Sequence, residues 1–172
     1  SRPVAKRPLV EHADAVVTLS TTAFDLAEEF GLPLRKLRLL PNFVVKQDKT
    51  AGQVFARRDW LYVGRLSEDK GILELARHWP TTEILDVYGD GPEKLRLQTL
   101  GRPGVRYRGV LPRDEIQGTM AKYRGLIFSS INPEPGPLVY LHALASGTPI
   151  LAKEGSSVAT EVQRSRSGAI FS

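Results

Sequence analysis

The residues best placed to do chemistry lie between an apolar run and a helical segment. The run Gly125–Phe128 ends at a polar turn, and Leu138–Ser146 follows with good helix formers. Free N–H groups at a helix start, together with the positive end of the helix dipole, bind anions. Glu134 lies in the loop before this helix, and His142 is eight positions further on. The carboxylate and the imidazole could therefore flank one pocket beside an anion site.

The elements that position these groups are short apolar runs that alternate with helical segments. Runs without polar alternation predict an α/β fold with a parallel sheet covered on both faces. From residue 60 onward, six strand–helix units predict a doubly wound, Rossmann-like sheet of order 3-2-1-4-5-6. Because right-handed crossovers bring all strand ends to one edge, we expect the polar residues after the strands to converge there: Arg65, Lys70, Gly89, Gly109 and Glu134.

Element boundaries follow from the same patterns. In the larger part, strands are expected over 60–63, 84–88, 105–107, 125–128, 150–152 and 169–171. Helices are expected to open at 67–71 and to cover 93–100, 112–123, 138–146 and 157–163. In the earlier part, residues 1–11 lead into a helix, and a strand, a capped helix, a second strand and a polar linker are expected over 15–19, 20–30, 37–40 and 46–52.

Two motifs at the predicted edge carry a family resemblance. The sequence Glu134–Pro149 resembles the nucleotide-sugar signature of the retaining glycosyltransferases of family 4, which have two Rossmann-like domains (the GT-B fold). That signature usually reads Glu-x-Phe-Gly-x-x-x-x-Glu, then Ala-x-Ala-x-Gly-x-Pro. The stretch Gly64–Gly71, with Arg65 and Lys70, resembles a second motif of the family. The chain departs from the signature at Gly136-Pro137, where Phe-Gly is usual, and at His142, which replaces the second Glu.

The resemblance implies a role for each matching residue. Arg65 and Lys70 would hold the donor diphosphate, and Glu134 would lie beside the donor sugar; these three are the predicted catalytic residues. Fixed cations can stabilise the charge that grows on a departing diphosphate, and no Asp-x-Asp motif occurs, so no metal or other cofactor is expected. The predicted donor-binding residues are Gly64, Arg65, Lys70, Gly109, Val110, Glu134, Pro137, Leu138, Val139 and His142.

The resemblance also implies how the enzyme is organised. Residues 1–45 would be the tail of an N-terminal acceptor domain with its hinge, 46–56 a linker, and 57–172 the donor domain, without its closing helices. A hexosyltransferase-like enzyme would transfer sugar from a UDP- or GDP-sugar to a glycan, lipid or small molecule held by the missing domain. A cytoplasmic location is expected, with peripheral membrane association as an open alternative. This chain alone would transfer no sugar, and the apolar edges at 15–19 and 37–40 would favour a non-native dimer or a disordered N-terminal segment.

Composition bounds these interpretations. The chain has 172 residues, 41% hydrophobic and 25% charged, as in globular domains. The absence of cysteine excludes disulfides, thiolate zinc sites and cysteine nucleophiles, and the three histidines are scattered. The net charge of +5 fits nucleic acid, an anionic membrane surface or a phosphate-bearing ligand. No recognition motif accompanies that charge, so nucleic acid is not an expected partner.

Several alternatives stay open. Neutral His142 accepts one hydrogen bond, whereas the family's Glu accepts both ribose hydroxyls, so ribose binding would be weaker or altered; the histidine could equally be a partly buried helix residue without a ligand. The same departure fits a non-catalytic nucleotide-sugar-binding or interaction module. Arg65, Lys70 and Glu134 could each be a solvated surface charge. A basic nucleic-acid or membrane-surface module and another Rossmann enzyme with a phosphorylated cofactor are the further rivals.

Overall fold

The computed structural model describes residues 12–46, 59–132 and 134–172. The chain divides into two compact units, one formed by residues 1–43 with 135–137 and the other by residues 44–134 with 138–172. The helix expected at the end of residues 1–11 and almost all of the expected linker lie outside the described residues.

The smaller unit contains two parallel strands and one helix. Strand β1 (Val16–Thr18) pairs with β2 (Leu37–Leu39), and α2 (Thr21–Glu29) and the 3₁₀ turn η1 (Leu34–Lys36) connect them. The helix begins where the sequence predicts, because the Ser20 hydroxyl accepts a hydrogen bond from the N–H of Ala23 at 3.1 Å. The strands and helix expected in this block are therefore confirmed.

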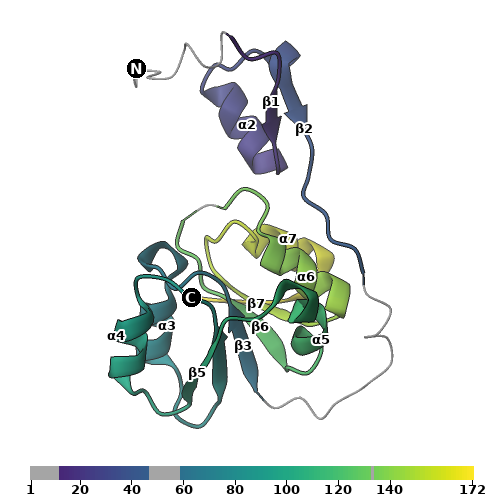
Figure 1. Cartoon of the computed structure of the whole chain (residues 1–172). Helices are drawn as coiled ribbons and strands as arrows, with labels where there is room; N and C mark the ends of the chain where they lie inside the picture. Colours follow the sequence, from purple (N-terminus) through teal and green to yellow (C-terminus); the bar gives the residue numbers. More distant parts are fainter. Residues whose placement is uncertain (1–11, 47–58, 133) are drawn as a thin grey trace. The chain divides into compact units, whose positions relative to one another are not determined.

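The larger unit is built on a six-stranded parallel sheet with the strand order β5-β4-β3-β6-β7-β8 (Figure 1). In chain order this is 3-2-1-4-5-6, so the predicted doubly wound topology is confirmed. The strand bounds are β3 Trp60–Val63, β4 Leu85–Tyr88, β5 Val105–Gly109, β6 Gly125–Phe128, β7 Ile150–Lys153 and β8 Gly168–Phe171.

Two hydrophobic cores lie on opposite faces of this sheet. Helices α3 (Ile72–His78) and α4 (Lys94–Leu100) contribute to one core, and α5 (Ile116–Met120), α6 (Leu138–Ser146) and α7 (Ala159–Ser165) contribute to the other. The packing of strand β6 against both cores explains why its sequence lacks polar alternation. Leu126 and Phe128 pack in the core of α5–α7, while Ile127 packs in the core of α3 and α4.

One expected helix is much shorter than predicted. The segment expected to be helical over 112–123 forms a 3₁₀ turn, η4 (Arg113–Glu115), followed by α5, which ends at Met120. After Met120 the N–H groups of Lys122 and Tyr123 bond three residues back, so the helix closes in a tighter turn. Gly118 inside the segment also weakens its helical preference.

Candidate functional site

The loops after β3 and β6 lie side by side because these two strands are neighbours in the sheet. Strand order reverses between them, since β4 and β5 lie beyond β3 while β7 and β8 lie beyond β6. In doubly wound sheets, the crevice beyond the strand ends at such a reversal is the usual place for a ligand. The residues that leave β3 and β6 therefore lie where such sheets usually bind a ligand.

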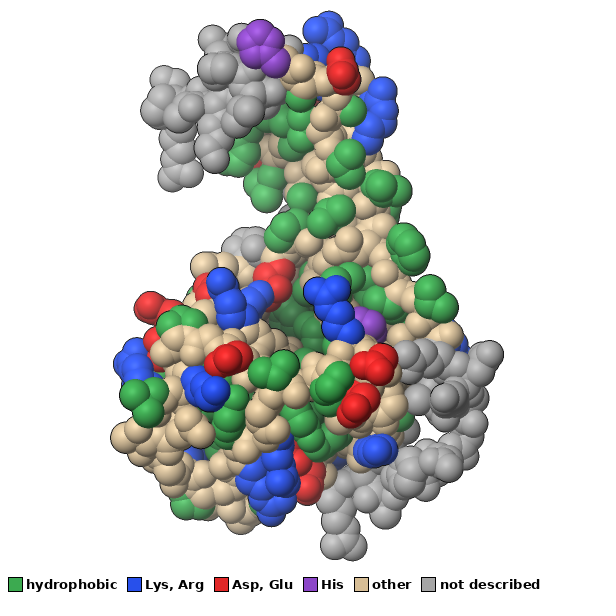
Figure 2. Space-filling model, viewed as in Figure 1, with side chains coloured by type: hydrophobic (Ala, Val, Ile, Leu, Met, Phe, Trp, Pro, Cys, Tyr) green, Lys and Arg blue, Asp and Glu red, His purple; other side chains and the backbone are tan. Residues whose placement is uncertain are grey.

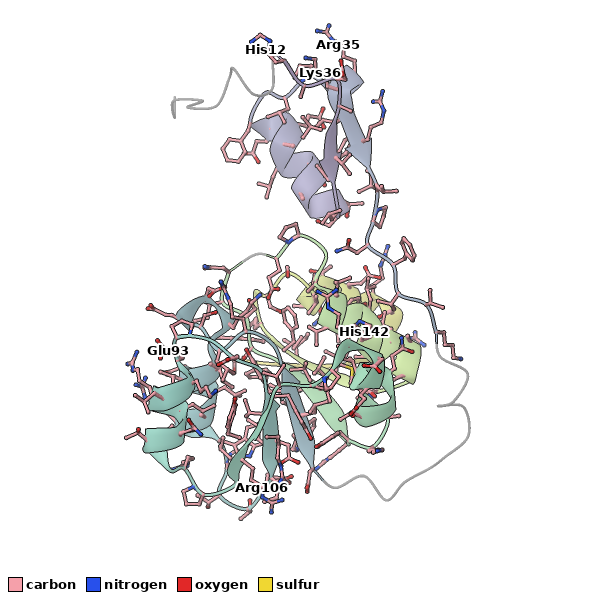
Figure 3. The ribbon with its side chains drawn as sticks, in the orientation of Figure 1. His12, Arg35, Lys36, Glu93, Arg106 and His142 are labelled. Atoms are coloured by element: carbon pink, nitrogen blue, oxygen red, sulfur yellow. The ribbon has the colours of Figure 1, made fainter. Side chains whose placement is uncertain are left out.

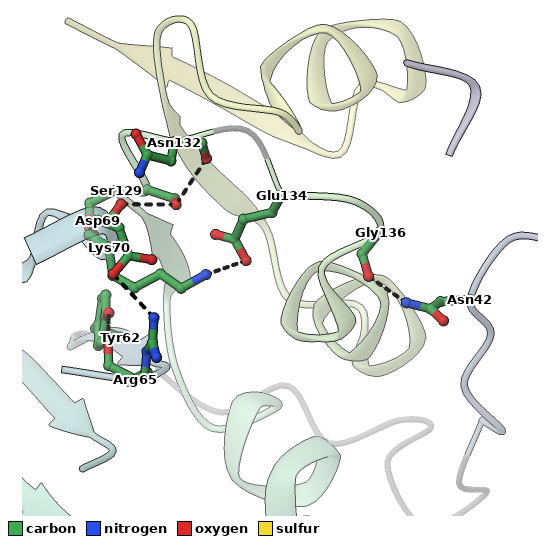
Figure 4. A network of polar contacts seen from close by, with 10 residues as sticks. Asn42, Tyr62, Arg65, Asp69, Lys70, Ser129, Asn132, Glu134 and Gly136 are labelled. Carbon is green, nitrogen blue, oxygen red and sulfur yellow. Dashed lines mark hydrogen bonds and ion pairs between the residues drawn. The ribbon is translucent and has the colours of Figure 1, made fainter. Parts of the chain in front are cut away.

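Hydrogen bonds fasten these two loops together (Figure 4). The hydroxyl of Ser129 donates to the carbonyl of Lys70 at 2.8 Å. The carbonyl of Asp69 accepts from the N–H of Ile131 at 2.9 Å and from the hydroxyl of Ser130 at 3.3 Å. Both serines are buried. The turn that carries Lys70 is therefore fixed against the end of β6.

A glycine permits this close approach. The loop after β3 forms the 3₁₀ turn η3 (Glu68–Lys70) and then Gly71, whose φ is 67°. A Cβ atom at this position would lie 2.5 Å from the carbonyl oxygen of Ser129. Gly71 thus meets both a left-handed backbone and a tight contact, which together exclude other residues without rearrangement.

Lys70 and Glu134 form an ion pair between the two loops (Figure 4). Their side chains are only 21% and 20% exposed. The expected convergence of residues that follow different strands is confirmed for this pair. A partly buried cation beside a partly buried carboxylate, at the sheet's reversal point, is the strongest chemical feature of this edge.

Arg65 lies at the same edge but is more open to solvent. Its guanidinium is 3.4 Å from the carboxylate of Asp69, and its side chain is 65% exposed. Its backbone carbonyl accepts a hydrogen bond from the hydroxyl of Tyr62 at 3.0 Å. Burial, and then the charges of Glu134 and Asp69, raise the pKa of the Tyr62 phenol well above its ordinary value. Tyr62 therefore stays neutral and acts as a donor that fixes the loop of Arg65.

His142 lies on α6, directly after the first turn of that helix (Figure 3). Burial lowers the pKa of its imidazole, which favours the neutral ring. Its Nδ1 is 3.5 Å from Nε2 of Gln117, and the same amide nitrogen donates to the carbonyl of Val45 at 2.7 Å. An amide nitrogen can only donate, so this contact favours the neutral tautomer that accepts at Nδ1 and carries its proton on Nε2. His142 therefore offers a donor where the family signature has an acceptor.

The remaining predicted residues fall at the same edge or at the start of α6. Gly109 ends β5, and Val110 after it is exposed. Gly64 follows β3 and donates its N–H to the carbonyl of Tyr88 at 3.1 Å. Leu138 and Val139 form the first turn of α6, and Pro137 immediately precedes it. No contact among the described residues joins Glu134 to His142, so the shared pocket stays a prediction.

The glycine-rich turn after β4 has a packing role. A Cβ on Gly89 would lie 1.8 Å from the carbonyl oxygen of Gly64, and one on Gly91 would lie 2.4 Å from that of Leu66. These glycines let the loop after β4 pack directly on the loop after β3.

Sequence reasoning missed the residues that position the site. As a sequence pattern, Ser129 and Ser130 predict only a polar turn, and no motif marks Tyr62, Asp69 or Gln117. A detectable signal existed for the serines, because two hydroxyls directly after a buried strand are placed to bond a neighbouring loop. The contacts of Tyr62 and Gln117 reach backbone carbonyls whose positions depend on the tertiary fold.

Neither a metal centre nor a membrane-spanning helix is found in the described parts of the chain. No group of three or more metal-ligating side chains is present there. None of the helices found there has the length and apolar character needed to cross a bilayer.

Comparison with known proteins identifies the larger unit. The family model described as glycosyl transferases group 1 matches residues 57–172. The chain belongs to the glycosyl transferases group 1 family. A glycogen synthase of Mycobacterium tuberculosis (strain CDC 1551 / Oshkosh) is 27% identical over 179 residues, covering 93% of this chain and 42% of that protein. The same match is found with the glycogen synthase of strain ATCC 25618 / H37Rv.

Solved structures share the fold of this group 1 glycosyltransferase chain. Sucrose-phosphate synthase from Thermosynechococcus elongatus superposes with a TM-score of 0.71 at 19% identity, over 95% of this chain and 46% of that one. The Anabaena protein Alr3699/HepE, solved with UDP and glucose, gives 0.68 at 20% identity, over 93% and 50%. The galactosyltransferase WaaB gives 0.69 at 20% identity, over 93% and 49%. The chain thus spans half or less of these relatives, and its sheet is that of a GT-B Rossmann-like domain.

Proposed function

We propose that this chain carries the donor site of a retaining glycosyltransferase, which moves a sugar from a nucleoside-diphosphate sugar to an acceptor hydroxyl. One observation carries the proposal: Lys70 and Glu134 leave different strands and meet, partly buried, where the strand order reverses. A cation there suits a diphosphate, and a carboxylate beside it suits sugar hydroxyls. Membership of the glycosyl transferases group 1 family supports the same assignment.

The diphosphate end of the donor is assigned to Arg65, Lys70 and the first turn of α6. As the acceptor oxygen bonds to the anomeric carbon, the bond from that carbon to the phosphate oxygen breaks, and its electron pair leaves with the diphosphate. Hydrogen bonds fix the backbone turn that carries Lys70, so its ammonium stabilises this charge from a rigid base. The N–H groups that open α6 add positive potential.

The sugar and nucleoside ends are assigned to the other predicted residues. Glu134 accepts hydrogen bonds from the donor sugar and stabilises positive charge at its anomeric carbon. His142 contacts the ribose, and backbone groups of Gly109 and Val110 contact the base. In front-face attack, an oxygen of the donor phosphate takes the proton of the acceptor. Retention then requires no second carboxylate at the spacing found in glycosidases.

The proposed donor is a UDP- or GDP-sugar, and no metal cofactor is included. Arg65 and Lys70 neutralise the diphosphate charge that a bound metal ion neutralises in metal-dependent enzymes. Alr3699/HepE was solved with UDP and glucose, and the Staphylococcus aureus protein TarM with UDP, which supports a nucleotide-sugar donor. No acceptor site is assigned among the described residues.

Calorimetric titration of Lys70→Ala with UDP, GDP and the bare nucleosides tests the assignment. A charge-assisted phosphate contact contributes roughly 1.5–3 kcal/mol, so diphosphate affinity should fall about ten- to a hundredfold while nucleoside affinity barely changes. Lys122→Ala is the matched control, because exposed Lys122 precedes β6 and so lies at the opposite end of the strands. Unchanged diphosphate affinity in Lys70→Ala would remove the main support for the donor site.

A second candidate function is a nucleotide-sugar-binding module without catalysis. Its basis is His142, which presents a ring N–H where the family signature has a carboxylate. His142→Glu restores that carboxylate and should tighten binding of nucleoside and diphosphate alike. Sugar transfer by the whole protein with wild-type His142 would reject this candidate.

A further inference from the structure

Both cations of the proposed diphosphate site are already paired with carboxylates of the chain. Arg65 contacts Asp69, four positions along the same loop, and Lys70 contacts Glu134 from the loop after β6 (Figure 4). Two positive and two negative charges therefore lie together at the carboxyl edge of β3 and β6. A site for a dianionic or trianionic ligand is thus electrically balanced before that ligand arrives.

An incoming diphosphate meets a competitor at Lys70. The carboxylate of Glu134 already forms an ion pair with the Lys70 ammonium, and both side chains are about four-fifths buried. A phosphate group placed on the same ammonium would lie close to that carboxylate, and like charges repel strongly where solvent screens them poorly. Diphosphate binding and the Lys70–Glu134 ion pair therefore oppose each other.

The two partners differ in how firmly they are held. The turn of Lys70 is fixed by Ser129 and, through the carbonyl of Asp69, by Ser130 and Ile131. Across the described residues, no backbone hydrogen bond holds Glu134, and prolines without a donor N–H flank it in the sequence. When the pair separates, Glu134 is the partner free to move.

We propose, building on the donor site assigned above, that Glu134 is an internal counter-ion that the donor diphosphate displaces from Lys70. Displacement replaces the Glu134 carboxylate with a phosphate group on the Lys70 ammonium, while the backbone turn of Lys70 stays in place. It also frees the Glu134 carboxylate, which then has hydrogen-bonding capacity for the hydroxyls of the donor sugar. Binding of the diphosphate and recognition of the sugar are coupled through one side chain.

The coupling makes two predictions for Glu134→Gln. UDP should bind more tightly, because its phosphates no longer compete with a carboxylate for Lys70. UDP no longer has to break this partly buried ion pair, so its affinity should rise about three- to tenfold. The advantage of a UDP-sugar over UDP should shrink, because an amide replaces the carboxylate that the displacement would deliver to the sugar.

The experiment is a calorimetric titration of UDP into wild type, Glu134→Gln, Lys70→Ala and the double variant. We expect the gain in Glu134→Gln to be smaller in the Lys70→Ala background, since the carboxylate then only repels the phosphates and no longer competes for the ammonium. Glu83→Gln is the matched control and should leave affinity unchanged. Glu83 is paired with Arg124, and it precedes β4, at the other end of the sheet. Glu134→Ala repeats the test with a second substitution, and thermal melting checks that each variant is folded.

The outcomes distinguish a failure of one proposal from a failure of both. If Lys70→Ala weakens UDP binding but neither Glu134 variant tightens it, the counter-ion proposal is wrong and the donor site stands. If the gain is as large in the Lys70→Ala background as in wild type, it is a general charge effect, and the counter-ion proposal is again wrong. If Lys70→Ala binds UDP as wild type does, the donor-site assignment fails. Absence of UDP binding in wild type and in both Glu134 variants overturns both proposals.

Discussion

Two ion pairs of the larger unit join similar charges but differ in their surroundings. Asp86, on β4, is buried; one of its carboxylate oxygens accepts from Nε of Arg108 at 2.9 Å and the other from the hydroxyl of Tyr123 at 2.8 Å. The Lys70–Glu134 pair, in contrast, joins two loops beyond the strand ends. The buried carboxylate is held on both oxygens, whereas the carboxylate at the edge has a single cation.

The difference separates an ion pair that maintains the fold from one that is available to a ligand. Asp86 and Arg108 belong to adjacent strands, so a ligand that replaced either side chain in this ion pair would disturb the sheet. Burial, followed by hydrogen bonds to Tyr88 and Asp86, raises the pKa of Tyr123 far above its ordinary value, so that phenol remains a donor. Glu134 can leave Lys70 without breaking any strand pairing. The comparison predicts that substitutions in one pair change stability and that those in the other change affinity.

The largest effect is expected from Asp86→Ala. Removing the carboxylate leaves the Tyr123 hydroxyl and the guanidinium of Arg108 without their partner, and should lower the free energy of unfolding by about 2–4 kcal/mol. Urea unfolding followed by the fluorescence of Trp60 and Trp79, both in the larger unit, measures this change. In Lys70→Ala the loss should be below about 1 kcal/mol. Equal losses in the two variants would contradict the comparison.

A smaller effect is expected from Gly71→Ala, which strains the turn that holds Lys70. The positive φ and the short approach to Ser129 predict a loss of about 1–3 kcal/mol in stability, together with weaker UDP binding. Gly118→Ala is the matched control, because nothing lies within 4 Å of its added Cβ and the position is helical. That change should be neutral or stabilising by up to about 1 kcal/mol. If both alanines behave alike in urea unfolding, the turn is not the rigid support described here.

The smallest effect is expected from titration of His142. Burial lowers its folded pKa, so the unfolded chain takes up the proton first as the pH falls. Stability should therefore decrease as the pH falls below about 6.5, the ordinary pKa of histidine. The decrease should be well under ~1 kcal/mol, because solvent reaches part of the ring. Unfolding of wild type and His142→Gln at pH 8 and pH 5.5 isolates the contribution of His142 to the pH dependence of stability. An identical pH dependence in the two proteins would contradict this prediction.

The sequence was most informative where hydrophobic pattern alone determines structure. Trp60–Val63 and Leu138–Ser146 form the expected strand and helix, and the order of the sheet follows from alternating strands and helices. The meeting of Lys70 and Glu134 could be predicted because parallel strands end at one edge. The helix over 112–123 was overestimated, because a pattern does not show where a helix closes into a tighter turn.

Other features of the site depend on partners that are distant in sequence. The tautomer favoured for His142 depends on Gln117, whose amide is oriented by the carbonyl of Val45, 72 positions away. The pairing of Arg65 with Asp69, in contrast, follows from the local turn.

The net charge of +5 is a weak guide to function, since Figure 2 shows Lys and Arg side chains interspersed with Asp and Glu over the larger unit on the face in view. Such interspersion does not favour a nucleic-acid surface.

A crystal structure of this chain with UDP tests the central claim most directly. We predict that the diphosphate lies within hydrogen-bonding distance of Nζ of Lys70, beyond the ends of β3 and β6, and that the Glu134 carboxylate has moved off the ammonium. The turn of Lys70 should keep its hydrogen bond from Ser129. UDP bound elsewhere, with the Lys70–Glu134 ion pair intact, would contradict the account.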